Sequence, residues 1–207
     1  MDTELGLRER KKIATKTALH EAAMRLAVAD GYDTVTVEAI ADAAGVSRRT
    51  FSNYFTGKEE ALLHGDSTRL AALLDSVEAR PADESAWPAL RAGTDLVLAE
   101  LQRRHLQRRD SGTDAGPGWL TRARLIRSHP ALLAEQVATY ASFERALAEE
   151  IERRLPAHRS TSRARVVAAC FLAALRVGIQ TWLDQPGDLT LRLCVDRALA
   201  EAGENFG

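Results

Sequence analysis

The stretch Val37–Phe55, VEAIADAAGVSRRTFSNYF, decides how this sequence is interpreted. Thr36 precedes it and Ser47 lies within it, and both are good N-cap residues, because a hydroxyl can accept from an unpaired amide of a first helical turn. Gly45 lies between them, where a helix ends in a left-handed residue and glycine carries no steric penalty. The stretch therefore predicts two short helices joined by a tight turn.

The second of these helices has an apolar face and a polar face. Phe51 and Phe55 are four residues apart and share the inward face. Arginine can pair with both major-groove acceptors of guanine, asparagine can pair with adenine, and hydroxyls suit phosphates. We therefore expect the outward face to read double-stranded DNA through Arg48, Arg49, Ser52, Asn53 and Tyr54. Ser47 and Thr50, at the start of the same helix, are expected to belong to the DNA-contacting set.

The residues around this unit carry further expectations. Glu38 lies in the first turn of the first short helix, where the positive end of the helix dipole favours an anion. Thr56 and Glu59 form a T-x-x-E capping box for a third helix. Lys58 lies in the first turn of that helix, and its ammonium can point at the sugar-phosphate backbone.

Residues 8–63 resemble the N-terminal domain of the TetR family of bacterial transcriptional regulators. The matching motifs are a basic first helix, T-V-x-x-I-A at Thr36, A-G-V-S at Ala44, and Y-F-x-x-K-E at Tyr54. The resemblance implies base contacts from Ser47 to Phe55 and phosphate contacts from Thr36, Tyr54 and Lys58. The sequence departs from the family at Ser52, where tyrosine is frequent, and at Asn53, so the recognised DNA is expected to be unusual.

Charge and composition agree with a small regulator. The chain has 207 residues and a formal net charge of -1, so its bulk charge gives no argument for DNA binding. Four lysines flank the expected recognition helix in the family pattern and are expected to neutralise phosphates, with a solvated helical face as the alternative: Lys11, Lys12, Lys16 and Lys58. The start lacks a signal peptide, and the apolar run Val166–Leu175 is about half of what a bilayer needs. We expect a cytoplasmic protein that does not insert into a membrane.

The rest of the sequence predicts helices only, so the expected fold is all-α with about nine helices. Leucine and alanine recur at helical spacing, and Pro and Gly mark the breaks. Residues 1–57 are expected to form the DNA-binding domain, and residues 58–207 an effector-binding and dimerisation domain. The helices expected in the second domain span residues 58–77, 85–109, 119–127, 130–155, 163–184 and 188–202.

The last two helices are expected to form the interface of a homodimer. The penultimate helix is apolar almost all the way round, so it must be covered on several sides. A central helix in a monomer is the alternative, but the resemblance favours a dimer that reads a palindrome. Cys170 and Cys194 lie in apolar helical runs and are best explained as reduced core residues, with a redox sensor left open.

The effector is less well defined by the sequence. Residues 121–151 loosely resemble the sensor domain of a TetR subgroup associated with acyl-CoA-like ligands. Seven arginines in residues 103–127 suit the phosphates of coenzyme A, although salt bridges to Glu149–Glu152 explain them without a ligand. The expected pocket residues, which plain core packing also explains, are Trp87, Trp119, Arg122, Tyr140, Phe143, Arg176 and Gln180.

Two other classes of function are less consistent with the sequence. A regulator of multidrug efflux that binds cationic or aromatic drugs is the alternative. Its binding site is expected to contain buried carboxylates among many aromatic side chains. An enzyme is not expected, because the sequence has no nucleophile elbow, P-loop, dinucleotide motif or H-E-x-x-H. We expect no cofactor, and no His, Cys and carboxylate cluster has the spacing of a metal site.

Overall fold

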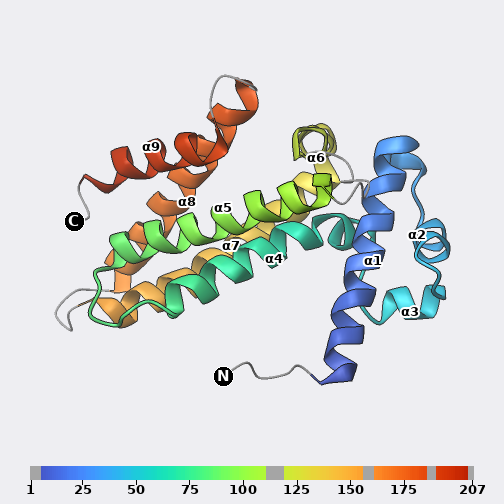
Figure 1. The fold of residues 1–207 in the computed structure, drawn as a ribbon, viewed down its shortest axis with the longest axis horizontal. Coiled ribbons are helices and arrows are strands. Elements are labelled where there is room, and N and C mark those ends of the chain that lie inside the picture. The colour runs from blue at the N-terminus through green and yellow to red at the C-terminus, as the bar shows by residue number, and fades with distance from the viewer. Residues whose placement is uncertain (1–5, 111–118, 156–160, 186–189, 205–207) are drawn as a thin grey trace. The chain divides into compact units, whose positions relative to one another are not determined.

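The computed structural model describes residues 6–110, 119–155, 161–185 and 190–204 (Figure 1). These residues form nine α-helices and one 3-10 turn, with no strand among them, which confirms the all-α class. The elements are α1 (Leu7–Ala29), η1 (Tyr32–Thr34), α2 (Val37–Ala43), α3 (Arg48–Ser52), α4 (Lys58–Glu78), α5 (Ala86–Asp110), α6 (Trp119–Ser128), α7 (Pro130–Arg154), α8 (Thr161–Asp184) and α9 (Leu191–Gly203).

The chain divides into two compact units. Unit 1 comprises Met1–Ser67 and Asp114–Ala138, and unit 2 comprises Thr68–Thr113 and Thr139–Gly207. Helices α4 and α7 each contribute residues to both units. The expected functional boundary after residue 57 stays a prediction, and the compact units divide the chain elsewhere.

Unit 1 is built on α1, against which α2 and α6 pack (Figure 1). Its core contains the fully buried side chains of Leu19, Ile40 and Phe51. Ile126 of α6 and Leu132 of α7 belong to the same core. The α6–α7 segment is therefore a structural part of the unit that carries the helix-turn-helix, although the sequence assigned it to the second domain.

Unit 2 has its own core, in which Trp87 of α5, Phe143 of α7 and Phe171 of α8 are buried. Helices α8 and α9 approach closely at Gly178, where an added Cβ would lie 2.6 Å from the Cα of Val195. Glycine is required at that position because backbone, which cannot rotate away, occupies the space of a side chain.

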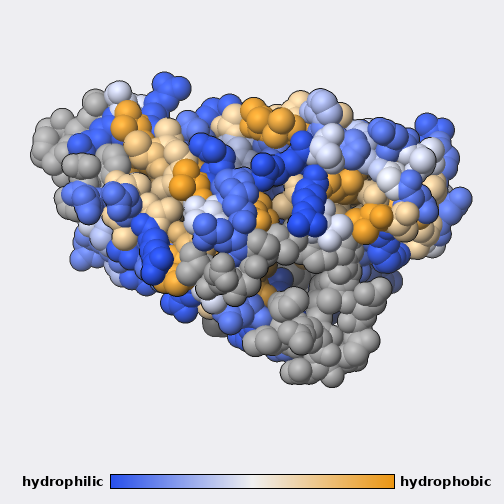
Figure 2. Space-filling view, turned by 90° about the horizontal axis from the view of Figure 1, so that it is seen from above, coloured by the Kyte–Doolittle hydropathy of each residue, from blue (hydrophilic) through white to orange (hydrophobic). Residues whose placement is uncertain are grey.

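Helix α8 is long and apolar enough to cross a membrane by length and composition alone, a test that core helices of soluble proteins also pass. The run Val166–Leu175 counted only uninterrupted apolar residues, so it understated the apolar length of α8. Eight residues of α8 are buried inside unit 2. On the face shown in Figure 2, hydrophobic residues lie in small groups between hydrophilic ones.

Candidate nucleic-acid interface

The caps expected from the sequence hold both short helices of unit 1. The Thr36 hydroxyl accepts from the Ala39 amide at 3.1 Å at the start of α2, and the Ser47 hydroxyl accepts from the Thr50 amide at 3.0 Å at the start of α3. Gly45 has a φ of 69° in the turn between them. The helix-turn-helix unit is therefore fixed by local chemistry that the sequence shows directly.

Helix α3 is shorter than expected, since it ends at Ser52 and not at Phe55. The Phe55 amide still donates to the Phe51 carbonyl at 3.0 Å, so the backbone turns once more after the helix ends. The Phe51 and Phe55 rings are both buried, with centroids 5.7 Å apart, which confirms their inward position. Asn53 and Tyr54 are consequently presented by a turn and not by the helix.

The polar face of α3 is open to solvent. Ser47, Arg48, Arg49, Ser52 and Asn53 are exposed, as is Thr36 at the start of α2, while Thr50 and Tyr54 are half-buried. The Thr50 hydroxyl lies 2.9 Å from the Ser47 hydroxyl, so the cap already engages it. The structure thus brings the predicted DNA-contacting side chains of α3 onto one accessible face.

The two arginines of this face differ in their surroundings. The Arg48 Nη1 atom lies 3.0 Å from Oε1 of Glu38, which is in the first turn of α2. Arg49 has no ion pair or side-chain hydrogen bond within the part of the chain that the structure describes. The sequence placed Glu38 at a helix N-terminus but gave no sign of its partner on α3.

Lys58 hydrogen-bonds to the segment that precedes α2. Its ammonium donates to the carbonyls of Tyr32 and Val35 at 2.9 and 3.0 Å, and it lies 4.1 Å from the centroid of the Tyr32 ring. Two of its three N–H donors are therefore engaged inside unit 1. The phosphate contact predicted for Lys58 stays a prediction, and only the third N–H of its ammonium is left to make it.

The predicted capping box of Thr56 and Glu59 is wrong in its second member. The Glu60 carboxylate accepts from the Thr56 amide at 2.7 Å and from its hydroxyl at 2.8 Å. Glu59 instead accepts from the Tyr32 hydroxyl, and burial together with this carboxylate raises the pKa of Tyr32. The Glu59 carboxylate is instead engaged by the hydroxyl of Tyr32, a residue distant in the sequence.

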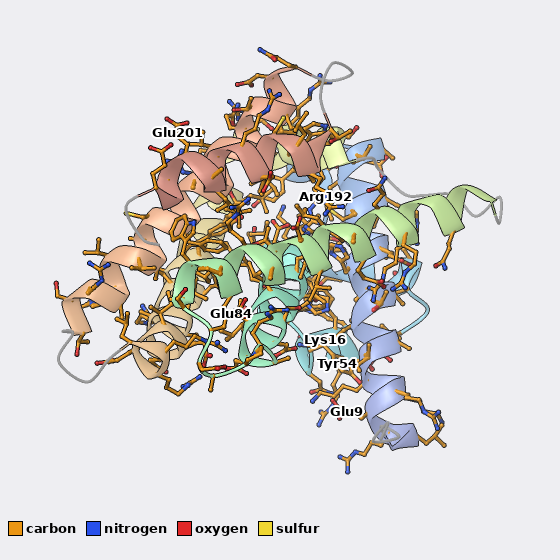
Figure 3. All side chains as sticks on the ribbon, turned by 60° about the vertical axis from the view of Figure 1, so that its left-hand side comes forward. Glu9, Lys16, Tyr54, Glu84, Arg192 and Glu201 are labelled. Atoms are coloured by element: carbon orange, nitrogen blue, oxygen red, sulfur yellow. The ribbon has the colours of Figure 1, made fainter. Side chains whose placement is uncertain are left out.

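Lys16 and Tyr54 project into the same region beside α1 (Figure 3). The Lys16 ammonium lies 5.5 Å from the centroid of the Phe55 ring, and the His64 ring lies 5.3 Å from that centroid. Burial, followed by the positive charge of Lys16, lowers the pKa of His64. Lys11 and Lys12 remain exposed, as residues that neutralise phosphates must be.

Arg122, predicted to contact an effector, is buried in unit 1. It is 8% exposed and lies 3.0 Å from Asp66 of α4. The Gln136 amide also donates to Asp66, at 3.4 Å, and the His129 ring lies 4.5 Å from the Tyr32 ring. The contacts shown for Arg122 thus join α6 to α4, while its effector role is an untested prediction.

Five of the other residues predicted to bind an effector fall in unit 2, with mixed surroundings. The Trp87 indole donates to the Leu199 carbonyl at 3.1 Å and packs edge-on against Phe171, and Phe143 is buried in the same core. Tyr140 packs at the edge of this core. Arg176 is exposed, and Gln180 donates to Asp184 at 2.6 Å. The side chain of Trp119 lies outside the described residues.

The ion pairs described for the arginine cluster around residues 103–127 and those described for the segment Glu149–Glu152 involve different partners. Arg103 and Arg104 pair with Glu100 of their own helix. Glu150 pairs instead with Arg153 and Arg154. In unit 2, Arg192 of α9 donates to Asp95 of α5 at 3.1 Å, a contact between distant segments (Figure 3).

Comparison with known proteins gives two family matches that together cover most of the chain. Residues 19–64 match the sequence model of bacterial regulatory proteins of the tetR family, and residues 97–207 match that of the MftR C-terminal domain. The chain is 35% identical over 178 residues to the HTH-type transcriptional regulator TcmR of Streptomyces glaucescens, covering 86% of this chain and 76% of TcmR.

Solved structures with a similar fold include two named FadR. FadR of Thermus thermophilus, a TetR-family transcriptional repressor in complex with lauroyl-CoA, has a TM-score of 0.53 and 22% identity over 90% of this chain and 92% of its own. The fatty acid degradation regulator FadR of Bacillus halodurans has a TM-score of 0.55 and 16% identity over 92% and 95%. At these identities the two structures show the fold alone. The helix-turn-helix unit, both family matches and the 35% identity to TcmR show that this chain belongs to the TetR family of bacterial transcriptional regulators.

Proposed function

We propose that this DNA-binding regulator is a cytoplasmic homodimeric repressor, released from a palindromic operator by a small hydrophobic effector of the acyl-CoA class. The observation that carries the DNA-reading part is the exposed polar face of α3, anchored from behind by the buried rings of Phe51 and Phe55. A rigid helix with a solvated Arg and Ser face, followed by Asn53 in the next turn, is suited to the major groove. The predicted contacts of Thr36, Tyr54 and Lys58 with phosphate belong to the same proposal.

The dimer part rests on α8 and α9. Val166, Cys170, Ala173 and Val177 follow one another at helical spacing along one side of α8. Val166 and Val177 are 50% and 49% exposed, and Leu193 of α9 is 38% exposed. Burying such a stripe against the same stripe of a second copy removes apolar surface from water. The resulting two-fold dimer would carry two α3 helices, which must lie about 34 Å apart to read a palindrome.

Sedimentation velocity tests the dimer directly. Val177→Glu places a charge in the proposed interface and should give a monomer that is still folded by circular dichroism. Arg165→Glu on the same helix is the control, because Arg165 is exposed and lies outside the stripe. A Val177→Glu protein that sediments as a dimer would remove α8 from the interface.

The proposal of an acyl-CoA effector is supported by the apolar interior of unit 2 and by the ligand of one structural neighbour. The FadR of Thermus thermophilus, which shares the fold, is in complex with lauroyl-CoA. In this chain Trp87 and Phe143 offer an apolar surface for an acyl chain, and Arg176 and Gln180 offer polar groups on α8 for a head group. The ligand releases the DNA if it binds more tightly to a state in which the spacing of the two α3 helices no longer matches the major groove.

The efflux alternative is less favoured by the charges of unit 2. A cationic drug requires a buried carboxylate that can pair with it. Glu150, 5% exposed, is the buried carboxylate among the described residues of unit 2, and Arg153 and Arg154 already neutralise it. The described part of unit 2 therefore offers a cation no unneutralised buried partner.

Fluorescence anisotropy on DNA from upstream of the protein's own gene tests the proposal. Lauroyl-CoA should release the DNA at micromolar concentration, whereas lauric acid and coenzyme A alone should not. Arg176→Ala should need more lauroyl-CoA for release, while Arg165→Ala should behave as the unmodified protein. Tight DNA binding that lauroyl-CoA leaves unchanged would refute the effector and keep the regulator.

A further inference from the structure

The two arginines at the start of α3 are adjacent in the sequence but are held differently. Arg48 pairs with Glu38 through Nη1, and Arg49 has no such partner among the described residues. Both side chains are exposed. Because exposed ion pairs contribute little to folding stability, the consequence of the Glu38 carboxylate lies in where it holds the guanidinium.

The pair is set by the turn of the helix-turn-helix unit. The Thr36 cap fixes the start of α2, which carries Glu38, and the Ser47 cap fixes the start of α3, which carries Arg48. Gly45 turns the chain between them with a φ of 69°. The carboxylate therefore approaches the guanidinium from a rigid neighbouring helix and not from a mobile loop.

Pairing through Nη1 leaves the edge formed by Nε and Nη2 available. That edge carries two parallel N–H donors, which match the O6 and N7 acceptors of guanine. The same carboxylate opposes a phosphate approaching Arg48, since two negative charges repel. An arginine held in this way is also partly ordered before DNA arrives, so binding costs it less side-chain freedom.

We propose that Glu38 is a positioning residue that makes Arg48 a reader of guanine and keeps it from acting as a phosphate anchor. This inference rests on the proposed reading of DNA by α3, and it divides the work of the two arginines. Arg48 supplies a base contact that depends on Glu38, whereas Arg49 acts without support from α2.

Loss of the carboxylate should weaken the discrimination between the selected site and unrelated DNA. In Glu38→Ala, Arg48 is released to phosphates, so affinity for unrelated DNA should rise and its dependence on salt should steepen by up to about one unit of log–log slope. Affinity for the selected site should fall relative to unrelated DNA by about threefold to tenfold. Glu38→Gln keeps an acceptor for Nη1 and should retain much of the discrimination.

Selection from a randomised DNA pool tests the proposal with the full-length protein. The unmodified protein should select a two-fold symmetric motif, and Glu38→Ala should lose its preference at the base pair that Arg48→Ala also loses. The double variant should lose no more than Arg48→Ala alone. Arg49→Ala is the matched control, which should affect a different base pair and combine with Glu38→Ala multiplicatively.

Two results would overturn the inference. Glu38→Ala could change affinity for selected and unrelated DNA by the same factor, which would make Glu38 a source of general repulsion. Its effect could also persist in the Arg48→Ala background, which would show that it does not act through Arg48. A different failure, in which the unmodified protein selects no motif, would remove the DNA-reading function on which the inference rests.

Discussion

Replacement of Gly178 by alanine tests the packing of α8 on α9. The added Cβ would lie 2.6 Å from the Cα of Val195, 2.9 Å from the Cys194 carbonyl oxygen and 3.0 Å from the Val195 nitrogen. All three are backbone atoms, and carbon atoms normally meet at about 3.5–4.0 Å. The two helices must therefore separate by about 1 Å to admit one methyl group.

The sign of the effect separates this packing argument from helix propensity. Glycine to alanine in an unobstructed helix stabilises by about 1 kcal/mol. Overpacking against backbone costs about 2–3 kcal/mol, at the upper end of the usual range. The two terms leave a net destabilisation of about 1–2 kcal/mol for Gly178→Ala.

Urea denaturation at a fixed protein concentration, followed by circular dichroism, measures this difference. Ala169→Gly on the exposed side of the same helix is the control, and should cost about 1 kcal/mol from propensity alone. If Gly178→Ala raised the stability by a similar amount, α8 and α9 would not approach each other as the structure shows.

Three further predictions concern unit 1. Lys58→Met leaves two backbone carbonyls without their ammonium donor, so it should lower the free energy of unfolding by about 1–3 kcal/mol in urea denaturation. Lys11 is exposed, so Lys11→Met should change that free energy little. Equal stability of the two variants would show that these hydrogen bonds of Lys58 do not stabilise unit 1. Burial, followed by the charge of Lys16, lowers the pKa of His64, so the unfolded state binds the proton more readily and stability is lost as the pH falls below 6.5, the ordinary histidine value. His64→Gln should flatten this loss in denaturation series between about pH 7.5 and 5.5, and a curve parallel to that of the unmodified protein would contradict the assignment. Gly45→Ala meets no atom within 4 Å but must adopt a φ of 69°, so it should cost about 1–2 kcal/mol in the same assay, and unchanged stability would show that the turn relaxes.

The sequence predicted those features of unit 1 that depend on neighbouring residues. Thr36 and Ser47 cap the helices as expected, and Gly45 adopts the positive φ that its position requires. These predictions succeed because each cap or turn is decided by atoms within about four residues. The helix order of unit 2 followed in the same way from helical spacing and from breaks at Pro and Gly.

Contacts between distant residues were not predictable in this way. Nothing in the local pattern indicates that Glu59 accepts from Tyr32, which leaves Glu60 to cap α4. Likewise, nothing in the local pattern indicates that Arg122 lies against Asp66 of α4. Each of these charged groups has several chemically similar partners in the sequence, and the packing of the helices determines which of them it contacts.

Hydroxyl-radical footprinting on the DNA upstream of the gene tests most directly the claim that this protein is a dimeric reader of a palindrome. We expect two protected half-sites with centres about 34 Å apart, one helical turn, and weaker protection of both in a folded Arg49→Ala variant. Protection of a single half-site, or equal protection along the whole fragment, would contradict it.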